Sequence, residues 1–351
     1  MKRIGIIGAG AIADAHLKAF KSNTGCVVTA ISDINVELAK KRAAEYGIEK
    51  VYGNYKELLH DTEIDAVSIV TPTFTHTDMV LDAFKAGKDV LCEKPPALNS
   101  DDVRKCIEAS KESGRFLMYA FVCRFRPHVK FLKEYIESGK MGEFVCAEAA
   151  RIYRSMDFNG WFCDKTKSGG FLFDSAIHEL DLMLYLMGYP KAKTVLGFTS
   201  KLNSDLPLRL GAASGKYVSL DTESYKRTME SFVEGTVILD NGASIRIKGS
   251  SALVAVTDGT YIEISGTKAG ARMEPNNSGR ELEIIEIGDN GFEKNAPKLE
   301  ECEVYGAEID HFIDCITNGT ECIAKPCEAA ALVDILNAIY KSAETGMAVD
   351  L

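Results

Sequence analysis

The sequence predicts an α/β protein with two domains, the first built on a doubly wound parallel sheet and the second on a large, mostly antiparallel open sheet. The chain has 351 residues, is 46% hydrophobic and contains only nine prolines, so it can bury a substantial core. Apolar runs alternate with helical periods in roughly the first 120 residues, whereas strand-type alternation prevails beyond about residue 190. We place the two domains at residues 1–121 and 122–351.

The first domain is predicted to repeat strand and helix. Its apolar runs are RIGIIGAG, VVTAISD, AVSIVTP, DVLCEKP and FLMYAF. Stretches between them, such as ELAKKRAAEYG and DMVLDAFKAGKD, carry apolar residues three and four positions apart. Strands that are apolar on both faces and alternate with helices form parallel sheets with right-handed crossovers.

The second domain is predicted to begin with helices at about residues 128–139 and 171–188. The runs AKTVLGFTS, ESFVEGTVILDNGASIRIKG, YIEISGT and LEIIEIGD then alternate as strands do, and Asn241-Gly242 is a typical hairpin turn. These runs indicate an antiparallel sheet. The tail from Glu308 to Ala343 returns to helix, because its apolar residues recur on one stripe.

The net charge and the lengths of the apolar runs restrict the classes of molecule that the protein is expected to bind. The formal net charge of -10 argues against nucleic acids and anionic membranes, which both require clustered Lys and Arg. No apolar run approaches the length of a membrane span, and MKRIGIIGAG enters a strand without a signal-peptide pattern. We expect a cytoplasmic protein with a small-molecule substrate. We also expect a homodimer or homotetramer, because one face of the open sheet needs an apolar or self-complementary partner.

The ten cysteines show no CxxC pair and no framework spacing, which predicts reduced thiols. His311 and Cys315 lie one helical turn apart, and together with Cys322 and Cys327 they can be arranged as a zinc set. The spacing from Cys322 to Cys327 is not usual for a ligand pair, so we expect a helix face and a loop here, and no metal.

A glycine-rich turn follows the first predicted strand and opens the next helix. In this turn Gly8 permits a tight bend, Gly10 lets the backbone approach a pyrophosphate, and Ala13 allows close helix packing. The N–H groups around Ala11 and Ile12 open a helix whose N-terminus attracts phosphates. Such a motif can also be an ordinary turn, but its position between strand and helix predicts a dinucleotide site.

An acidic residue, Asp33, ends the second predicted strand and is followed by Ile34 and Asn35. A carboxylate at this point accepts hydrogen bonds from ribose hydroxyls and repels a 2'-phosphate, whereas NADP sites usually offer an arginine. We therefore expect NAD, with NADP less favoured. Asp33 can also be the N-cap of the following helix, and both roles are compatible.

The segment VLCEKPPA places Glu93 and Lys94 directly behind a buried strand, where two prolines stop it. Ligands of doubly wound sheets bind at the carboxyl ends of strands, so we expect this pair at the cofactor crevice. Lysine there can donate to a substrate hydroxyl and take part in proton transfer. The alternative is a surface lysine beyond a strand.

A second polar cluster lies in the segment 168–181. On a helix, Asp174 and His178 are four positions apart on one face, and Asp181 follows three positions later. Histidine is the natural group to take a proton from a secondary alcohol, with a carboxylate to orient it. The pair can also bind a metal, but no third ligand is evident; as a further alternative it is a solvated surface pair.

In combination, these motifs resemble the Gfo/Idh/MocA family, named for glucose-fructose oxidoreductase and inositol dehydrogenase. The matching segments are GAGAIA near the start, TPTFTH at 71–76, CEKP at 92–95 and WFCDKTKSGGFLFDSAIHELD at 161–181, together with the closing helix. The resemblance covers essentially the whole chain. It implies a Rossmann domain, a second α/β domain whose open sheet often forms the oligomer interface, and an active site between the domains.

By match to the family motifs, the resemblance implies a catalytic trio of Lys94, Asp174 and His178. Asp181 completes the HxxD pattern. Thr71, Pro72 and His76 match the loop beside nicotinamide and ribose, where His76 can equally be structural. The family often has glycine where Phe171 and Ala176 stand, so the backbone near the substrate is expected to be more crowded here.

The stretch between the domains supplies further candidates for substrate hydroxyls: Arg124, Arg151, Tyr153, Arg154, Asn159 and Trp161. Arginines and aromatics at these positions can instead brace the domain junction.

The resulting expectation is an NAD-dependent dehydrogenase that transfers a hydride between nicotinamide and a secondary alcohol of a cyclic polyol or sugar, for example an inositol. Two alternatives stay open: an NAD-dependent glycosidase that works by transient oxidation and elimination, and a non-catalytic NAD-binding sensor.

Overall fold

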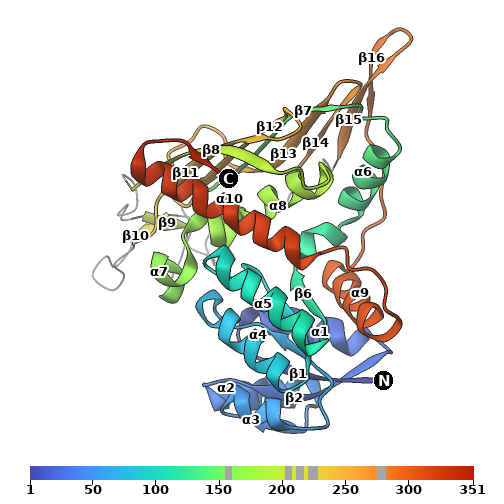
Figure 1. Cartoon of the computed structure of the whole chain (residues 1–351), viewed down its shortest axis with the longest axis vertical. Coiled ribbons are helices and arrows are strands. Elements are labelled where there is room, and N and C mark those ends of the chain that lie inside the picture. Colours follow the sequence, from blue (N-terminus) through green and yellow to red (C-terminus); the bar gives the residue numbers. More distant parts are fainter. Residues whose placement is uncertain (155–159, 202–207, 211–216, 220–227, 275–281) are drawn as a thin grey trace. The chain divides into compact units, whose positions relative to one another are not determined.

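The computed structural model describes residues 1–154, 160–201, 208–210, 217–219, 228–274 and 282–351 (Figure 1). Two compact units make up the chain. The first comprises Met1–Phe125 and Cys302–Val333, and the second comprises Arg126–Glu301 and Asp334–Leu351. A parallel sheet in the first unit and a mostly antiparallel one in the second confirm the predicted α/β class.

In the first unit the described residues form a six-stranded parallel sheet with the order β3-β2-β1-β4-β5-β6. The strands are β1 (Lys2–Ile7), β2 (Cys26–Ser32), β3 (Lys50–Tyr52), β4 (Ala66–Ile69), β5 (Asp89–Glu93) and β6 (Leu117–Ala120). The helices are α1 (Ala11–Ser22), α2 (Val36–Tyr46), α3 (Tyr55–His60), α4 (His76–Lys85), α5 (Ser100–Ser113) and α9 (Val304–Asn318), with the 3-10 turns η1 (Thr73–Thr75) and η2 (Val122–Phe125). The strand order reverses between β1 and β4, which is where such sheets bind ligands.

In the second unit the described residues form a nine-stranded sheet with the order β16-β15-β14-β13-β7-β12-β11-β8-β17. The strands are β7 (Phe144–Ile152), β8 (Ala192–Ser200), β11 (Phe232–Leu239), β12 (Ser244–Ser250), β13 (Gly259–Gly266), β14 (Ala269–Met273), β15 (Glu283–Gly288), β16 (Gly291–Asn295) and β17 (Val349–Asp350); β9 (Leu208–Leu210) and β10 (Tyr217–Ser219) pair separately. The helices are α6 (Pro127–Glu137), α7 (Lys165–Ser168), the π-helix η4 (Leu172–Ala176) and α8 (Ile177–Leu186), with the 3-10 turn η3 (Gly160–Cys163). The helix α10 (Pro326–Thr345) contributes residues to both units.

The sequence analysis does not predict strand β7, and the structure corrects this omission. The strand lies in the middle of the sheet, parallel to β12 and antiparallel to β13. Its run FVCAEAARI is rich in alanine, which is a poor strand former, so propensity gives no strand signal. Ala147 and Ala149 are buried, which indicates that small side chains at these positions allow helix α8 to approach the sheet.

Two predicted helices also differ in detail. The segment predicted as one helix over 171–188 begins as the π-helix η4 and continues as α8. The tail predicted as one helix consists of α9 and α10, because Gly319 ends α9 in the left-handed conformation (φ 75°) and Pro326 opens α10.

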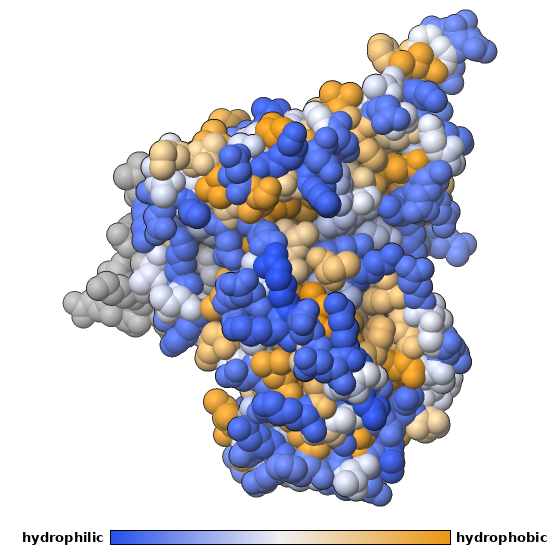
Figure 2. Space-filling model, in the orientation of Figure 1, coloured by the Kyte–Doolittle hydropathy of each residue, from blue (hydrophilic) through white to orange (hydrophobic). Residues whose placement is uncertain are grey.

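One face of the nine-stranded sheet is packed against helices α8 and α10, and the other carries exposed apolar side chains toward its two edges. The exposed apolar residues are Leu196, Phe198 and Ile238 near one edge and Ile285, Ile287 and Phe292 near the other. The latter edge ends in the β15–β16 hairpin, which projects beyond the other strands in Figure 1 and shows apolar groups beside hydrophilic ones in Figure 2.

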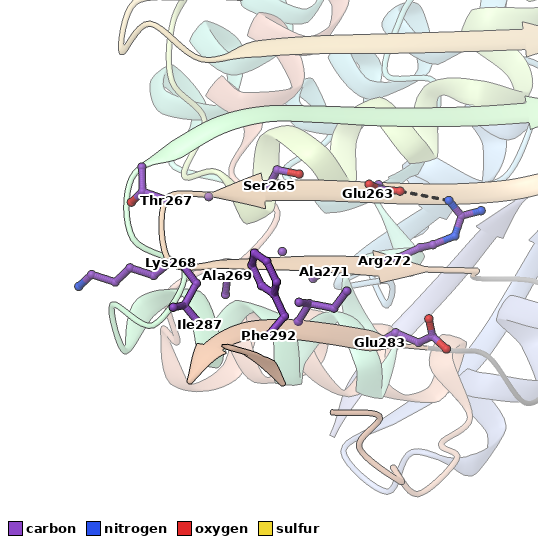
Figure 3. Close-up of a pocket in the computed structure, with 13 residues that line it drawn as sticks. Glu263, Ser265, Thr267, Lys268, Ala269, Ala271, Arg272, Glu283, Ile287 and Phe292 are labelled. Atoms are coloured by element: carbon purple, nitrogen blue, oxygen red, sulfur yellow. Dashed lines mark hydrogen bonds and ion pairs between the residues drawn. The ribbon is translucent and has the colours of Figure 1, made fainter. Parts of the chain in front are cut away.

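A hollow of about 340 Å³ lies on this open face, over strands β13 to β16. Figure 3 shows Ile287 and Phe292 toward one end of the hollow and the ion pair between Glu263 and Arg272 toward the other. A second ion pair, Arg246 with Glu148 at 2.6 Å, continues the charged band across the middle of the sheet. Among the described residues, no helix has both the length and the apolar character of a membrane span.

Candidate active site

The turn after β1 has the geometry that a pyrophosphate requires. Gly8 has φ 110°, and a Cβ added there would lie 2.6 Å from the carbonyl oxygen of Val70, so only glycine fits. Gly10 is the N-cap of α1 and provides no side-chain cap to the first N–H groups of the helix. Apart from Gly10 and its two chain neighbours, no atom of the described residues lies within 4 Å of a Cβ built on Gly10. The open space and the uncapped N–H groups fit the phosphates of a dinucleotide.

Asp33 joins this turn to the end of β2. Its Oδ2 accepts the N–H of Ala9 at 2.7 Å, and its Oδ1 accepts the N–H of Asn35 at 2.7 Å. The side chain that caps α2 is Asn35, which accepts the N–H of Leu38, so the alternative role of Asp33 as N-cap is not what the structure shows. A fixed, partly exposed carboxylate at this point fits the hydroxyls of a ribose.

Glu93 ends β5 with a buried carboxylate that has two partners. Its Oε1 accepts the Nε2–H of His16 at 2.9 Å, and its Oε2 accepts the N–H of Lys94 at 3.0 Å. The other ring nitrogen of His16 lies 3.0 Å from the hydroxyl of Ser68. Burial alone would raise the pKa of Glu93, but the hydrogen bond and charge of His16, with the charge of Lys94, hold it below its usual value. The carboxylate therefore fixes the backbone from which Lys94 extends.

His76 connects the loop at Thr71 to the loop at Pro95. It is fully buried, with Nδ1 2.8 Å from the carbonyl oxygen of Pro95 and Nε2 2.8 Å from that of Thr71. Burial lowers the pKa of His76, although both carbonyl oxygens favour its protonated form. Thr71 also shares a hydrogen bond with Thr75 at 2.8 Å, which holds the loop that contains Pro72. The first unit thus links the residues around Gly8, Asp33, Thr71 and Lys94 at the carboxyl ends of its strands.

In the second unit the polar cluster lies on η4 and α8. Asp174 is in the π-helix, a feature that often marks functional sites, and its Oδ2 accepts the hydroxyl of Ser175 at 2.9 Å. His178 is the second residue of α8 and is partly exposed. Asp181 is buried, and its Oδ1 accepts the hydroxyl of Tyr189 at 2.6 Å. Asp181 therefore has a structural contact at the end of α8.

The start of η4 is held by a buried glutamate that the sequence analysis missed. Glu230 accepts the N–H of Phe171 at 2.8 Å and the hydroxyl of Tyr340. A Cβ added at Gly170, which has φ 100°, would lie 2.5 Å from the Tyr340 hydroxyl, so glycine is needed for this approach. Burial and the charge of Glu230 raise the pKa of Tyr340 well above its usual value.

A buried ion pair anchors α8 to the sheet. Arg151 on β7 donates from Nε and Nη2 to both carboxylate oxygens of Glu179, at 2.8 and 2.6 Å. Glu179 stands next to His178 in the chain, so the pair also fixes the backbone of the histidine. The sequence around Glu179, Glu230 and His16 gives no signal that identifies their partners.

The remaining substrate candidates contact their own chain. The Arg124 guanidinium is fully buried, donates to Glu328 and, at 2.7 Å, to the carbonyl oxygen of Ile323. Arg154 donates to the carbonyl oxygens of Ala255 and Val256 and pairs with Asp258 at 3.3 Å. The Trp161 ring stacks on Phe162, and the Tyr153 hydroxyl lies 3.4 Å from Arg151. Contact of these residues with a substrate stays a prediction. Asn159 lies outside the described residues.

Comparison with known families identifies the family to which the chain belongs. A model described as an oxidoreductase family with an NAD-binding Rossmann fold matches residues 2–121, and the C-terminal alpha/beta domain of the same family matches residues 133–351. The chain belongs to the Gfo/Idh/MocA oxidoreductases. The predicted family, the oxidoreductase class and NAD as the cofactor are thereby confirmed.

Relatives span the chain almost completely. It is 28% identical to D-glucoside 3-dehydrogenase of Escherichia coli (strain K12), over 99% of this chain and 97% of the relative. It is 30% identical to inositol 2-dehydrogenase of Rhizobium meliloti (strain 1021), over 97% and 96%. A solved structure of levoglucosan dehydrogenase in complex with NADH and L-sorbose shares the fold, with a TM-score of 0.84 at 24% identity, over 100% of this chain and 98% of that chain.

Proposed function

We propose that this Gfo/Idh/MocA protein reversibly oxidises a secondary alcohol of a cyclic polyol or sugar, with NAD as the hydride acceptor. The relatives named above are dehydrogenases of a glucoside and of an inositol. The observation that carries the proposal is the fixed position of Lys94, whose backbone N–H is held by the buried Glu93 carboxylate in the unit that contains the dinucleotide turn. A lysine fixed there supports a reaction at the cofactor, which a passive NAD-binding module does not require.

The proposed roles follow from the chemistry of the side chains. Bound NAD would accept the hydride from the carbinol carbon. His178 would receive the hydroxyl proton, the ammonium of Lys94 would donate a hydrogen bond to the reacting oxygen, and Asp174 would orient the imidazole. Lys94 belongs to the first unit and His178 to the second.

A substrate panel tests the reaction. Inositols, glucosides, anhydrosugars and free aldoses are each incubated with NAD and the protein, and the absorbance of NADH is followed. We expect NADH to accumulate with at least one cyclic polyol or sugar. Release of an aglycone from a glycoside without net NADH would instead favour cleavage by transient oxidation. NAD binding with neither activity across the panel would favour the sensor.

Two variants test the roles of the side chains. Lys94→Ala and His178→Ala are each expected to lower kcat about a hundredfold or more, since general acid-base groups contribute about a hundredfold to ten-thousandfold. NAD affinity and the melting temperature are expected to change little. Lys111→Ala and His60→Ala are matched controls, because both residues are exposed and lie outside the proposed site. Near wild-type turnover by either active-site variant would assign that residue to the scaffold.

The cytoplasmic location and the preference for NAD over NADP stay predictions. Both are compatible with the proposed reaction but do not follow from it.

A further inference from the structure

Three potential metal ligands converge in the first unit, away from the dinucleotide turn in the sequence. His311 and Cys315 lie one turn apart on α9, and Cys322 lies in the loop between α9 and α10. One donor atom from each lies within 4.8 Å of the other two, and Nε2 of His311 is 3.5 Å from Sγ of Cys315. The sequence analysis considers these residues with Cys327 and expects no metal. The structure brings three of the four together and leaves Cys327 exposed outside the group.

The loop that carries Cys322 is held in place by polar contacts. The buried Arg124 donates to the carbonyl oxygen of Ile323, and the N–H of Ile323 donates to Nε2 of His311 at 3.1 Å. The thiol of Cys322 donates to the carbonyl oxygen of Ala324 at 3.3 Å. The two thiols are therefore held near the imidazole without a disulfide, since both cysteines are free. A cluster that is organised in this way loses little freedom when it binds an ion.

We propose that His311, Cys315 and Cys322 bind a thiophilic divalent cation, Zn²⁺, with a solvent molecule as the fourth ligand. Zinc takes thiolate at about 2.3 Å and imidazole at about 2.0–2.1 Å, which in a tetrahedron sets sulfur and nitrogen about 3.6 Å apart. The observed separation of 3.5 Å between Sγ of Cys315 and Nε2 of His311 fits that geometry. Two thiolates and a neutral imidazole would balance the charge of the ion.

Binding has a definite proton balance. Burial raises the pKa of Cys315 to about 11 and that of Cys322 to about 12, so both thiols carry protons at neutral pH in the metal-free protein. The ion forms two Zn–S bonds and releases both thiol protons, so affinity increases with pH. The ion also takes the lone pair of His311 that now accepts the Ile323 N–H, which lowers the affinity relative to a dedicated zinc finger.

A bound ion would cross-link helix α9 and the loop before α10. It would connect the C-terminal half of α9 to the start of α10 through residues 319–325, the loop that Arg124 already braces. Because the ion binds only the folded arrangement, zinc is expected to raise the melting temperature of the protein.

Metal binding is measured on the full chain after it has been stripped of metal. Zn²⁺ is titrated in competition with a chromogenic chelator, and Co²⁺ is used as a probe because thiolate ligands give it intense near-ultraviolet charge-transfer bands. We expect one equivalent per chain. Cys315→Ser and Cys322→Ser should each weaken binding roughly a hundredfold or more, and His311→Gln should weaken it less severely.

Matched controls separate this site from adventitious binding. Cys302→Ser and Cys327→Ser remove exposed thiols and should leave the zinc affinity unchanged. Cys315→Ala serves as a second variant, and thermal melts verify that each variant is folded. The proposal is overturned if no stoichiometric binding is found, if the Co²⁺ complex lacks thiolate bands, or if the exposed-cysteine variants lose the metal instead. None of these outcomes depends on the proposed dehydrogenase activity.

Discussion

Two buried glutamates in the first unit differ in their hydrogen-bond partners and therefore in the direction in which their pKa is shifted. Glu93 remains charged because His16 and the Lys94 N–H stabilise its carboxylate. Glu308 on α9 is also fully buried, but neither of its oxygens has a hydrogen-bond partner among the described residues. Burial, followed by the charge of Glu93, raises the pKa of Glu308 well above 4.5. Burial therefore favours the protonated form of Glu308 in the folded protein.

Glu308 is expected to destabilise the protein increasingly as pH rises. The unfolded chain releases the proton of Glu308 above about pH 4.5, whereas the folded protein retains it to a much higher pH, so folding takes up a proton. Stability is thus lost as pH rises from about 4.5 through the folded pKa. Glu308→Met, which keeps the volume and removes the acid, should stabilise the protein by about 1–3 kcal/mol at neutral pH.

Chemical denaturation at several pH values measures this effect. The gain of Glu308→Met should shrink toward pH 4, where the unfolded chain also holds the proton. A gain that is independent of pH would show that Glu308 has the same pKa in the folded and unfolded chains, which would contradict the prediction. Loss of stability at all pH values would mean that the acid makes a favourable contact.

Asp33 is expected to set the choice of cofactor. Its carboxylate is fixed by two backbone N–H groups, and the two residues that follow it in the chain, Ile34 and Asn35, carry no positive charge for a 2'-phosphate. The protein should bind NADH more tightly than NADPH, and Asp33→Ala should narrow the difference by about tenfold or more, since a like charge is removed. Fluorescence titration of both nucleotides measures the ratio. Glu57→Ala, an exposed acid on α3, is the control, and equal affinities in the wild type would refute this role.

At the scale of elements, the approach of α10 to the sheet depends on glycine. A Cβ added at Gly197 on β8 would lie 2.0 Å from the carbonyl oxygen of Ile339. A backbone atom cannot move aside as a side chain can, so Gly197→Ala should force the helix away from the strand and destabilise the protein by about 1–3 kcal/mol. Gly270 on β14 of the same sheet has its nearest neighbour at 3.7 Å, so Gly270→Ala should be close to neutral. Thermal melts of both variants compare them, and equal melting temperatures would contradict close packing of α10.

The elements that the sequence predicts are those whose pattern is local. The strand-helix repetition, the Gly8 turn, Asp33 and the Asn241-Gly242 hairpin each follow from a few neighbouring residues. Strand β7 does not follow from neighbouring residues. Its alanines leave room for helix α8, which packs against the strand. Nor do neighbouring residues predict the partners of His16, Arg124 and Glu230, which lie 77, 204 and 110 positions away in the chain. A long-range contact leaves no trace in a local pattern.

At the scale of the whole molecule, the open face of the nine-stranded sheet has the surface that the predicted self-association requires. Ion pairs cross its middle, and exposed apolar side chains flank them toward both edges. Apolar groups at the edges and ion pairs in the middle can match those of a second copy of the same face. In a two-fold dimer the same surface of each subunit forms the interface. The predicted homodimer or homotetramer would bury these apolar groups.

Light scattering coupled to gel filtration tests this assembly. The wild type should be larger than a monomer, and Leu196→Glu with Phe198→Glu should shift it toward the monomer, because two charges would be buried in the interface. Val256→Glu changes an exposed apolar residue that lies outside the strands and should leave the mass unchanged. A monomeric wild type at micromolar concentration would remove the argument for an interface on this face.

The first unit is assembled from the N-terminal segment Met1–Phe125 and the distant segment Cys302–Val333, and this has a consequence for biosynthesis. Helix α9 packs on α1, its Tyr305 ring lies 5.9 Å from the ring of His16, and Asn23 bonds to Asp310 across 287 positions. A ribosome makes the entire intervening unit before α9 emerges. Until then the flank of α1 that packs on α9 has no cover, and apolar surface exposed in this way makes a nascent chain prone to aggregation. The part of the protein that binds the cofactor is thus begun first and finished nearly last.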